Sequence, residues 1–116
     1  MIQLGPQTRI LVTGDPLDLR KGIDGISCFC RRILQEDPTN GTVFVFVNRR
    51  KTQIKALAYD GQGFWLMTKR LSSGSFPFWP RRDELVTRLR AEQVYILLRG
   101  GNPYLAPTLD EWRKIS

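Results

Sequence analysis

The sequence predicts an α+β fold: a curled antiparallel sheet, built on a central three-stranded meander, with one long and one short helix. Three observations predict it. Residues 42–71 contain three β-rich runs separated by two turns, as in a meander. Apolar residues recur at helical spacing between residues 19 and 35. A shorter helical pattern occupies residues 91–98. Strands and helices that occur in separate runs are typical of this class.

The N-terminal part predicts a short strand followed by the long helix. The β-rich run 9–13 favours a strand. Asp15 or Asp18 then offers an N-cap for the helix. We expect this helix over residues 19–35, because Asp37-Pro38 prevents its continuation.

Two glycines fall in the first turns of this helix. Gly22 and Gly25 each cost a helix about 1 kcal/mol relative to alanine. Their presence indicates that another group approaches the helix closely. That group is either a strand of the same protein or the backbone of a partner.

The meander is predicted from side-chain alternation and from turn residues. The first strand alternates, with three valines on one face and two phenylalanines on the other, at Val43, Val45, Val47, Phe44 and Phe46. A strand that is apolar on both faces is covered on both sides. Asp60-Gly61-Gln62-Gly63 is typical of a hairpin connection. The strands and turns are expected at 42–47, 48–51, 53–59, 60–63 and 64–71.

The C-terminal third predicts smaller elements. Prolines exclude a helix from residues 76–80, which we expect to be extended. A short strand is expected over 85–89, before the short helix. We expect residues 1–101 to form a single α+β domain and residues 102–116 to form an extension. Three apolar side chains are available to dock this extension on the body: Leu105, Leu109 and Trp112.

The chain is strongly basic. Its 116 residues include 18 Lys and Arg against 11 Asp and Glu, which gives a formal net charge of +7. Thirteen of these cations are arginine, whose planar fork matches phosphate better than lysine does. Such a chain either binds a polyanion (DNA, RNA or an acidic protein surface) or carries a solvated basic surface.

Composition also indicates the compartment. The first ten residues lack the apolar core of a signal peptide, and no run approaches the roughly 18 apolar residues of a membrane span. Cys28 and Cys30 point in different directions on the predicted helix and cannot pair. The chain contains no His, so these cysteines do not form a zinc site. We therefore expect a cytoplasmic protein with no membrane contact, metal or cofactor.

The basic residues are clustered around one predicted hairpin tip. The candidate nucleic-acid-binding residues are Arg49, Arg50, Lys51 and Lys55, extended by Arg20, Lys21, Lys69 and Arg70. Lys69 and Arg70 belong to this set because the third strand of the meander returns toward the tip. The alternative is that charges at the tip serve only solubility.

Arg20 and Lys21 lie at the start of the predicted long helix, where positive charge is mildly unfavourable. Their position indicates either a bound anion, which helix starts attract, or pairing with a nearby aspartate. The aspartates within reach are Asp15, Asp18 and Asp24.

Three aromatic residues form a second candidate surface. Phe76, Phe78 and Trp79 could bind a partner protein or stack on nucleic-acid bases. With Pro77 and Pro80 beside them, they are more often a segment that packs over the sheet.

The sequence offers little for catalysis. Acid–base chemistry near neutral pH usually uses His or a tuned carboxylate pair, and metal-dependent nucleotidyl transfer uses convergent carboxylates. The candidates for such a group are Asp15, Asp18, Asp24 and Asp60. Asp18 is better explained as a cap and Asp60 as a turn residue. We therefore expect no catalytic residue and no enzymatic activity.

An ordered set of motifs resembles one family. The set is Asp18-Leu19-Arg20-Lys21-Gly22-Ile23-Asp24-Gly25, Val43-Phe44-Val45-Phe46, Asn48-Arg49-Arg50, Ile54-Lys55-Ala56-Leu57, Tyr59-Asp60-Gly61-Gln62-Gly63-Phe64, Lys69-Arg70-Leu71, Gly74-Ser75-Phe76 and Trp79-Pro80. In this set the chain is similar to TnpB, the small accessory protein encoded by the second open reading frame of insertion sequence 66 elements. It departs from the family at Ala58-Tyr59, where a Trp-rich pair is usual, and in its longer tail.

The resemblance implies a protein that assists transposition, a DNA recombination reaction, beside a separate transposase that performs the chemistry. Our first hypothesis is a non-catalytic accessory protein that binds DNA, at the element ends or the target, through its basic patch. The second is an adaptor whose basic face docks on an acidic surface of the transposase, anchored by Phe76, Phe78 and Trp79, without contacting DNA. The third is a metal-dependent nuclease that uses Asp18, Asp24 and Asp60. The oligomeric state is left open.

Overall fold

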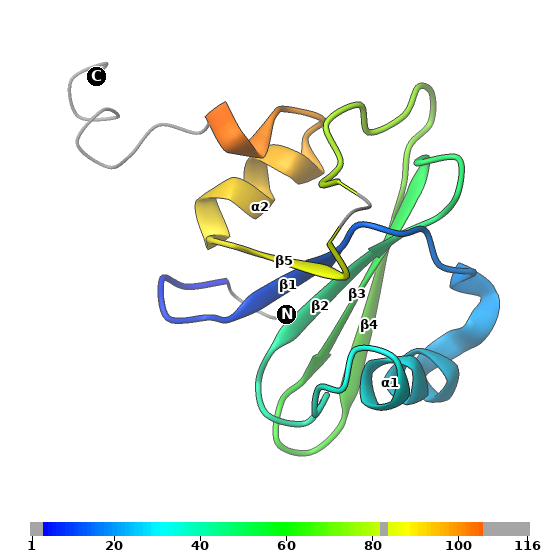
Figure 1. The fold of residues 1–116 in the computed structure, drawn as a ribbon, viewed down its shortest axis with the longest axis vertical. Helices are drawn as coiled ribbons and strands as arrows, with labels where there is room; N and C mark the ends of the chain where they lie inside the picture. Colours follow the sequence, from blue (N-terminus) through cyan, green and yellow to red (C-terminus); the bar gives the residue numbers. More distant parts are fainter. Residues whose placement is uncertain (1–3, 82–83, 106–116) are drawn as a thin grey trace.

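The computed structural model describes residues 4–81 and 84–105. Within these residues, five strands form one sheet, accompanied by two α-helices and two 3₁₀ turns (Figure 1). The strands are β1 (Ile10–Thr13), β2 (Val43–Val47), β3 (Gln53–Tyr59), β4 (Phe64–Arg70) and β5 (Val86–Leu89). The helical elements are η1 (Leu19–Lys21), α1 (Gly22–Arg32), α2 (Ala91–Leu98) and η2 (Pro103–Leu105). The predicted α+β class is confirmed, as is the short helix 91–98.

The sheet has the strand order β4-β3-β2-β1-β5 and is mixed. β2, β3 and β4 form the predicted antiparallel meander, and β5 pairs antiparallel with β1. β1 and β2 are parallel, with Ile10 opposite Val43, so the prediction of an antiparallel sheet is wrong for this pair. The reason is that α1 lies in a crossover connection between the two strands. This connection returns the chain to the end of the sheet at which β1 begins, so β2 runs in the same direction as β1.

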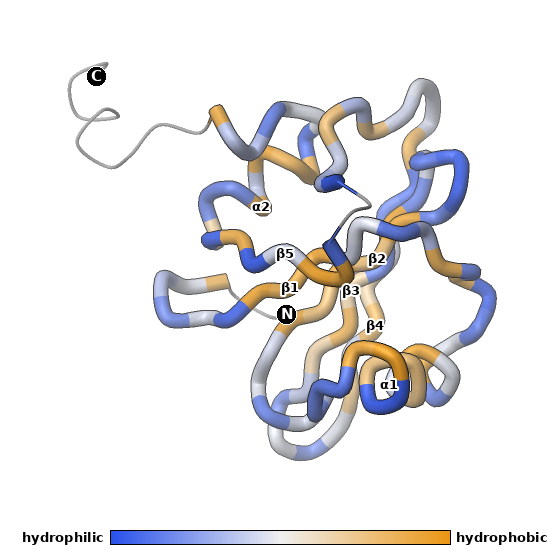
Figure 2. The backbone as a smooth tube through the Cα atoms, in the orientation of Figure 1, coloured by the Kyte–Doolittle hydropathy of each residue, from blue (hydrophilic) through white to orange (hydrophobic). Residues whose placement is uncertain are grey.

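A helix packs on each side of the sheet, which creates two cores (Figure 1). The three valines of β2 join the core on the α2 side, and its two phenylalanines join the core on the α1 side. The predicted alternation of this strand is therefore confirmed. Figure 2 shows β1 and β2 in hydrophobic colours, whereas the loop that joins β2 to β3 is hydrophilic.

The long helix is shorter than predicted and is divided. Asp18 caps the 3₁₀ turn η1, and Gly22 has a φ of 71° at the junction with α1. This left-handed conformation interrupts regular α-helix and is easiest for glycine. α1 ends at Arg32, and the left-handed φ of 54° at Gln35 prevents its continuation toward Asp37.

The prediction that a strand approaches Gly22 and Gly25 is wrong. A Cβ at Gly22 would meet no described residue within 4 Å, and one at Gly25 would first meet the Lys21 side chain, 2.8 Å away. Close approach by a partner stays a prediction. Among the described glycines, the closest contact is at Gly14, where a Cβ would collide with the backbone oxygen of Arg81.

The aromatic segment 76–80 is a turn packed against the core, and it is not extended as predicted. Phe76 is fully buried and Trp79 is 7% exposed, and their ring centroids lie 5.9 Å apart. Trp79 Nε1 also donates to the backbone oxygen of Thr13 at 2.7 Å. Phe78 lies on the outside and is 45% exposed. Burial therefore removes Phe76 and Trp79 from the predicted partner-binding surface.

The C-terminal residues are described only in part. Pro103 in η2 is buried, whereas Leu105 is 77% exposed. Leu109 and Trp112 lie outside the described residues, so the docking of the extension and the domain boundary at residue 101 stay predictions. None of the helices in the described ranges has the length and apolar character needed to cross a membrane.

The two phenylalanines of the aromatic segment provide a matched test of this packing. We expect Phe76→Ala to lower the free energy of unfolding by about 3–5 kcal/mol, because it removes a fully buried ring. Phe78→Ala should change it by less than about 0.5 kcal/mol, because that side chain is at the surface. Urea denaturation followed by circular dichroism measures both. Similar losses in the two variants would contradict the assigned burial.

Candidate nucleic-acid interface

A cleft of about 910 Å³ lies at the end of the sheet where the β2–β3 hairpin turns. The segment before α1, the hairpin tip and the adjoining ends of β3 and β4 form its walls. The lining residues are Pro16, Leu17, Asp18, Leu19, Arg20, Asn48, Arg49, Arg50, Thr52, Gln53, Lys55 and Arg70. Five cationic side chains and one carboxylate give this lining a formal charge of +4, and it contains no aromatic residue.

Strand pairing decides which basic residues of β3 and β4 face the cleft. Lys55 lies on the same face of β3 as Leu57, which packs in the core beside α1. Arg70 is opposite Gln53, and it therefore shares that face. Lys69 points to the other face, where its Nζ donates to the backbone oxygen of Leu98 at the end of α2, at 2.5 Å.

Asn48 organises the hairpin tip that carries Arg49 and Arg50. Its Oδ1 accepts the backbone N–H groups of Thr52 at 2.9 Å and Gln53 at 3.1 Å, and its Nδ2 donates to Thr52 Oγ1 at 3.0 Å. These bonds tie both sides of the turn to one side chain. The shape of the tip therefore depends on Asn48.

Lys51 closes this turn and joins it to the core. Its backbone N–H donates to the backbone oxygen of Asn48 at 3.0 Å, and its φ of 57° is left-handed. Its backbone oxygen accepts the N–H of Phe76 at 2.8 Å. Because Phe76 is buried, the basic tip is anchored on the α2-side core.

Arg20 reaches the cleft from η1 and is paired with Asp18. Its Nε and Nη2 donate to Oδ1 and Oδ2 of Asp18 at 3.0 and 2.9 Å, and its backbone N–H donates to Oδ1 at 3.0 Å. The side-chain bonds, followed by the backbone bond, lower the pKa of Asp18 from its usual 3.8 to about 2. Of the two explanations for Arg20, the structure shows the pairing, and a bound anion stays a prediction.

The structure brings five of the eight predicted basic residues into this one cleft. They are Arg20, Arg49, Arg50, Lys55 and Arg70. The other three are not part of the lining: Lys21 lies over Gly25, Lys51 forms the turn, and Lys69 lies on the opposite face. Among the described carboxylates, only Asp18 forms an ion pair with a cation of the cleft.

Two polar residues have roles in the cleft that were not predicted from the sequence. Asn48 was recognised only as a turn residue, and Asp18 as a cap, a charge partner or a carboxylate of the nuclease hypothesis. An Asn placed directly between a strand and a basic run is the signal that indicates the first role. The second role depends on the fold, because only the fold brings Asp18 to the hairpin tip.

The carboxylates of the nuclease hypothesis do not converge. Asp18 lines the cleft, whereas Asp60 follows the far end of β3, about 20 Å along the strand. The Asp60 carboxylate stabilises the β3–β4 turn. It accepts the backbone N–H groups of Gln62 and Gly63 and the indole N–H of Trp65 at 2.8–3.0 Å. These bonds, led by that from Gln62, lower its pKa. In the described part of the chain, no three His, Cys, Asp or Glu side chains form a group suited to a metal.

The two cysteines occupy different environments. Cys28 is exposed, Cys30 is buried, and both are free. Burial raises the pKa of the Cys30 thiol to about 12, which makes it an unreactive core residue.

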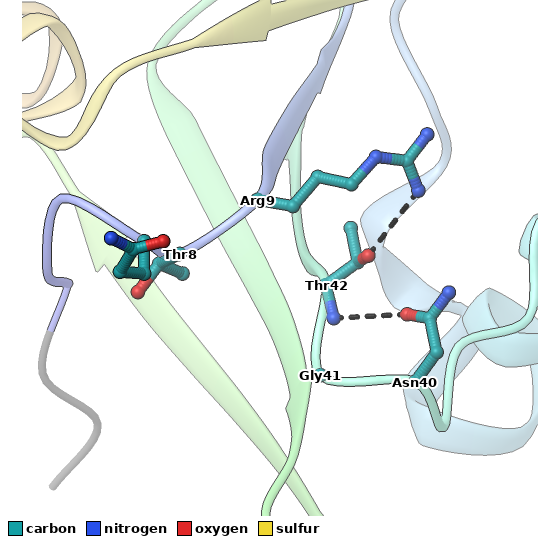
Figure 3. Close-up of a pocket in the computed structure, with 6 residues that line it drawn as sticks. Thr8, Arg9, Asn40, Gly41 and Thr42 are labelled. Carbon is teal, nitrogen blue, oxygen red and sulfur yellow. Dashed lines mark hydrogen bonds between the residues drawn. The ribbon is translucent and has the colours of Figure 1, made fainter.

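A second, smaller pocket of about 330 Å³ lies between residues 7–9 and 40–42 (Figure 3). Its one cation, Arg9, donates to Glu36 at 2.8 Å and more weakly to Thr42 Oγ1 at 3.4 Å. Asn40 accepts the backbone N–H of Thr42 at 3.0 Å. Arg9 and Asn40 thus both bind Thr42, and the contact of Arg9 joins the start of β1 to the start of β2.

Comparison with known proteins gives a consistent family. The model of the family described as "IS66 Orf2 like protein" matches residues 8–105. Two proteins of Sinorhizobium fredii are similar to this chain. "Uncharacterized protein y4jC" is 34% identical over 99 residues, which cover 84% of each chain. "Uncharacterized protein y4hO" is 31% identical over 100 residues, which cover 86% of each. No solved structure matches.

The role of Asn48 is testable through stability. We expect Asn48→Ala to lower the free energy of unfolding by about 1–3 kcal/mol, because it leaves two backbone N–H groups without their acceptor. The matched control is Asn40→Ala, which removes a single part-buried turn hydrogen bond and should cost less, about 1 kcal/mol. Chemical denaturation measures both. An Asn48 variant no less stable than the Asn40 variant would contradict this role.

The Asp18–Arg20 pair predicts a defined acid titration. The folded-state pKa of Asp18 is lowered to about 2. The stability that the pair contributes is therefore fully present when the pH is above the pKa of Asp18 in the unfolded chain. It is lost as the pH falls from about 4 toward 2. Carbon NMR of the Asp18 carboxyl should show a midpoint near 2 in the natural protein, and Arg20→Gln should return it toward 3.8. A midpoint unaffected by this substitution would contradict the pairing.

Proposed function

Because the chain belongs to the IS66 Orf2-like family, a family of accessory proteins of transposition, we propose that it binds DNA through the cleft. The DNA is that of the element ends or of the target, and the protein assists a separate transposase there without performing the chemistry. One observation carries the proposal: five cationic side chains from three separate segments line the same cleft, at Arg20, Arg49, Arg50, Lys55 and Arg70.

The ligand of such a cleft is the phosphate backbone. Guanidinium groups bind phosphate oxygens through two parallel hydrogen bonds, and four of the five cations have no carboxylate partner among the described residues. Each phosphate neutralised contributes about −0.9 to the slope of log affinity against log salt. Contacts by four or five of these side chains give a slope of about −4.

The chemistry of the lining favours duplex DNA over an unpaired strand. Single-strand binders stack bases on aromatic side chains, whereas the lining of this cleft contains none. Phe76 and Trp79 are buried and are not available for stacking. Binding is therefore expected to depend on the backbone, with little preference for sequence.

The adaptor hypothesis loses two of its three aromatic anchors to burial and keeps Phe78 and the basic face at the surface. A pull-down of the transposase with nuclease present separates the two functions. A DNA-bridged pair is lost under nuclease treatment, which is the result that we expect. An adaptor would keep its partner.

Removal of charge at the hairpin tip tests the proposed function directly. We expect the double variant Arg49→Gln/Arg50→Gln to bind random duplex DNA about tenfold more weakly, because two phosphate contacts are lost. The salt slope should become less negative by about 2. Fluorescence anisotropy at several salt concentrations measures both quantities.

The matched control is Arg31→Gln/Arg32→Gln. It removes the same charge from another exposed arginine pair, at the end of α1 and outside the cleft. This variant should retain most of the affinity and the full slope. Unchanged binding by the tip variant, or equal losses in both, would remove the cleft as the binding site.

A further inference from the structure

Asp18 is the one carboxylate among the residues that line the cleft, and it is bound to one of the five cations. Two side-chain hydrogen bonds, at 3.0 and 2.9 Å, hold the Arg20 guanidinium on this carboxylate. In this arrangement, one of the paired donor edges of the guanidinium, formed by Nε and Nη2, is already donated to the protein's own chain.

The pair is well placed to exchange with a ligand. The side chains of Arg20 and Asp18 are 91% and 48% exposed, and exposed ion pairs contribute little to stability. A phosphate accepts the same two parallel N–H groups of a guanidinium as a carboxylate does. A phosphate can therefore replace Asp18 at Arg20 at small cost.

The exchange does not require η1 to unfold. Asp18 Oδ1 also accepts the backbone N–H of Arg20, at 3.0 Å, as the N-cap of this turn. That bond is independent of the guanidinium and persists when the side chain turns away. Arg20 can thus leave the Asp18 carboxylate without a change in the backbone of η1.

We propose that Asp18 limits the affinity of the cleft for DNA by holding Arg20 in the free protein, and that a phosphodiester backbone takes over the Arg20 guanidinium on binding. The inference rests on the proposed function. A backbone already held by Arg49 and Arg50 presents its next phosphates to Arg20 at high effective concentration. A single anion lacks this advantage and leaves the pair closed.

Asp18→Asn tests the inference without disturbing the turn, because asparagine is an equally good N-cap. The probe is a random-sequence duplex of about 30 base pairs, or three helical turns, in fluorescence anisotropy at several salt concentrations. We expect about threefold tighter binding than the natural protein shows. The salt slope should change little, because Arg20 contacts a phosphate in both complexes.

Two controls separate release of Arg20 from a simple change of charge. Asp24→Asn removes an exposed carboxylate in the first turn of α1, outside the cleft, and should raise affinity less than Asp18→Asn. In an Arg20→Gln background, Asp18→Asn should raise the affinity for the duplex no more than Asp24→Asn does.

The outcomes distinguish this inference from the proposed function. If the natural protein binds the duplex but Asp18→Asn gains equally in both backgrounds, Asp18 does not act through Arg20, and the inference alone is overturned. The inference alone is also overturned if Asp18→Asn and Asp24→Asn raise the affinity of the natural protein for the duplex equally. If the natural protein does not bind the duplex, the proposed function is overturned together with the inference.

Discussion

The position of the cleft charges depends on the pairing of β3 with its two neighbours. Ile54 and Leu57 are buried on opposite faces of this strand, and a shift of one residue would exchange the two faces. Lys55 would then leave the cleft, and Leu57 would leave the α1-side core. The apolar residues that fix the register for stability therefore also fix which basic residues meet at the hairpin tip.

The cleft gathers like charges, which repel one another and disfavour the folded state. Two features of the fold reduce this cost. Asp18 neutralises Arg20 locally, and Arg49 and Arg50 extend into water from a tip that Asn48 holds in shape. A tip already ordered by Asn48 loses less backbone entropy on binding than a flexible loop would lose. The arrangement thus spends a little stability on a preformed cationic surface.

Local patterns predicted most of the elements. The alternation of β2, the Asp60 turn and α2 each depend on residues within one short segment, and each was read correctly. The parallel pairing of β1 with β2 was missed, because it depends on a crossover through α1 that no local pattern encodes. The division of the long helix was missed for a different reason: a glycine in a helical pattern does not reveal whether its φ is positive.

The candidate site was predictable in its composition but not in its geometry. Alternation along a strand already separates Lys69 from Arg70, because adjacent residues face opposite sides, and assigning both to one surface overlooked this rule. The pairing of Arg70 with Gln53 is needed to decide that Arg70, and not Lys69, points into the cleft. For Phe76 and Trp79, the neighbouring prolines favoured a segment packed over the sheet, but the sequence did not show which of the aromatic residues is buried, because their contacts with the core are long-range.

The break between η1 and α1 leaves the cleft open. α1 packs against β3 and β4, and a continuous helix from Leu19 would carry its first turn along a different path. Instead, Asp18 caps a 3₁₀ turn and Gly22 redirects the chain with its positive φ. This places Leu19 in the α1-side core and Arg20 at the cleft. The short run from Asp18 to Gly22 therefore does three things at once: it starts the helix, forms a wall of the cleft, and supplies both its fifth cation and the carboxylate that binds it.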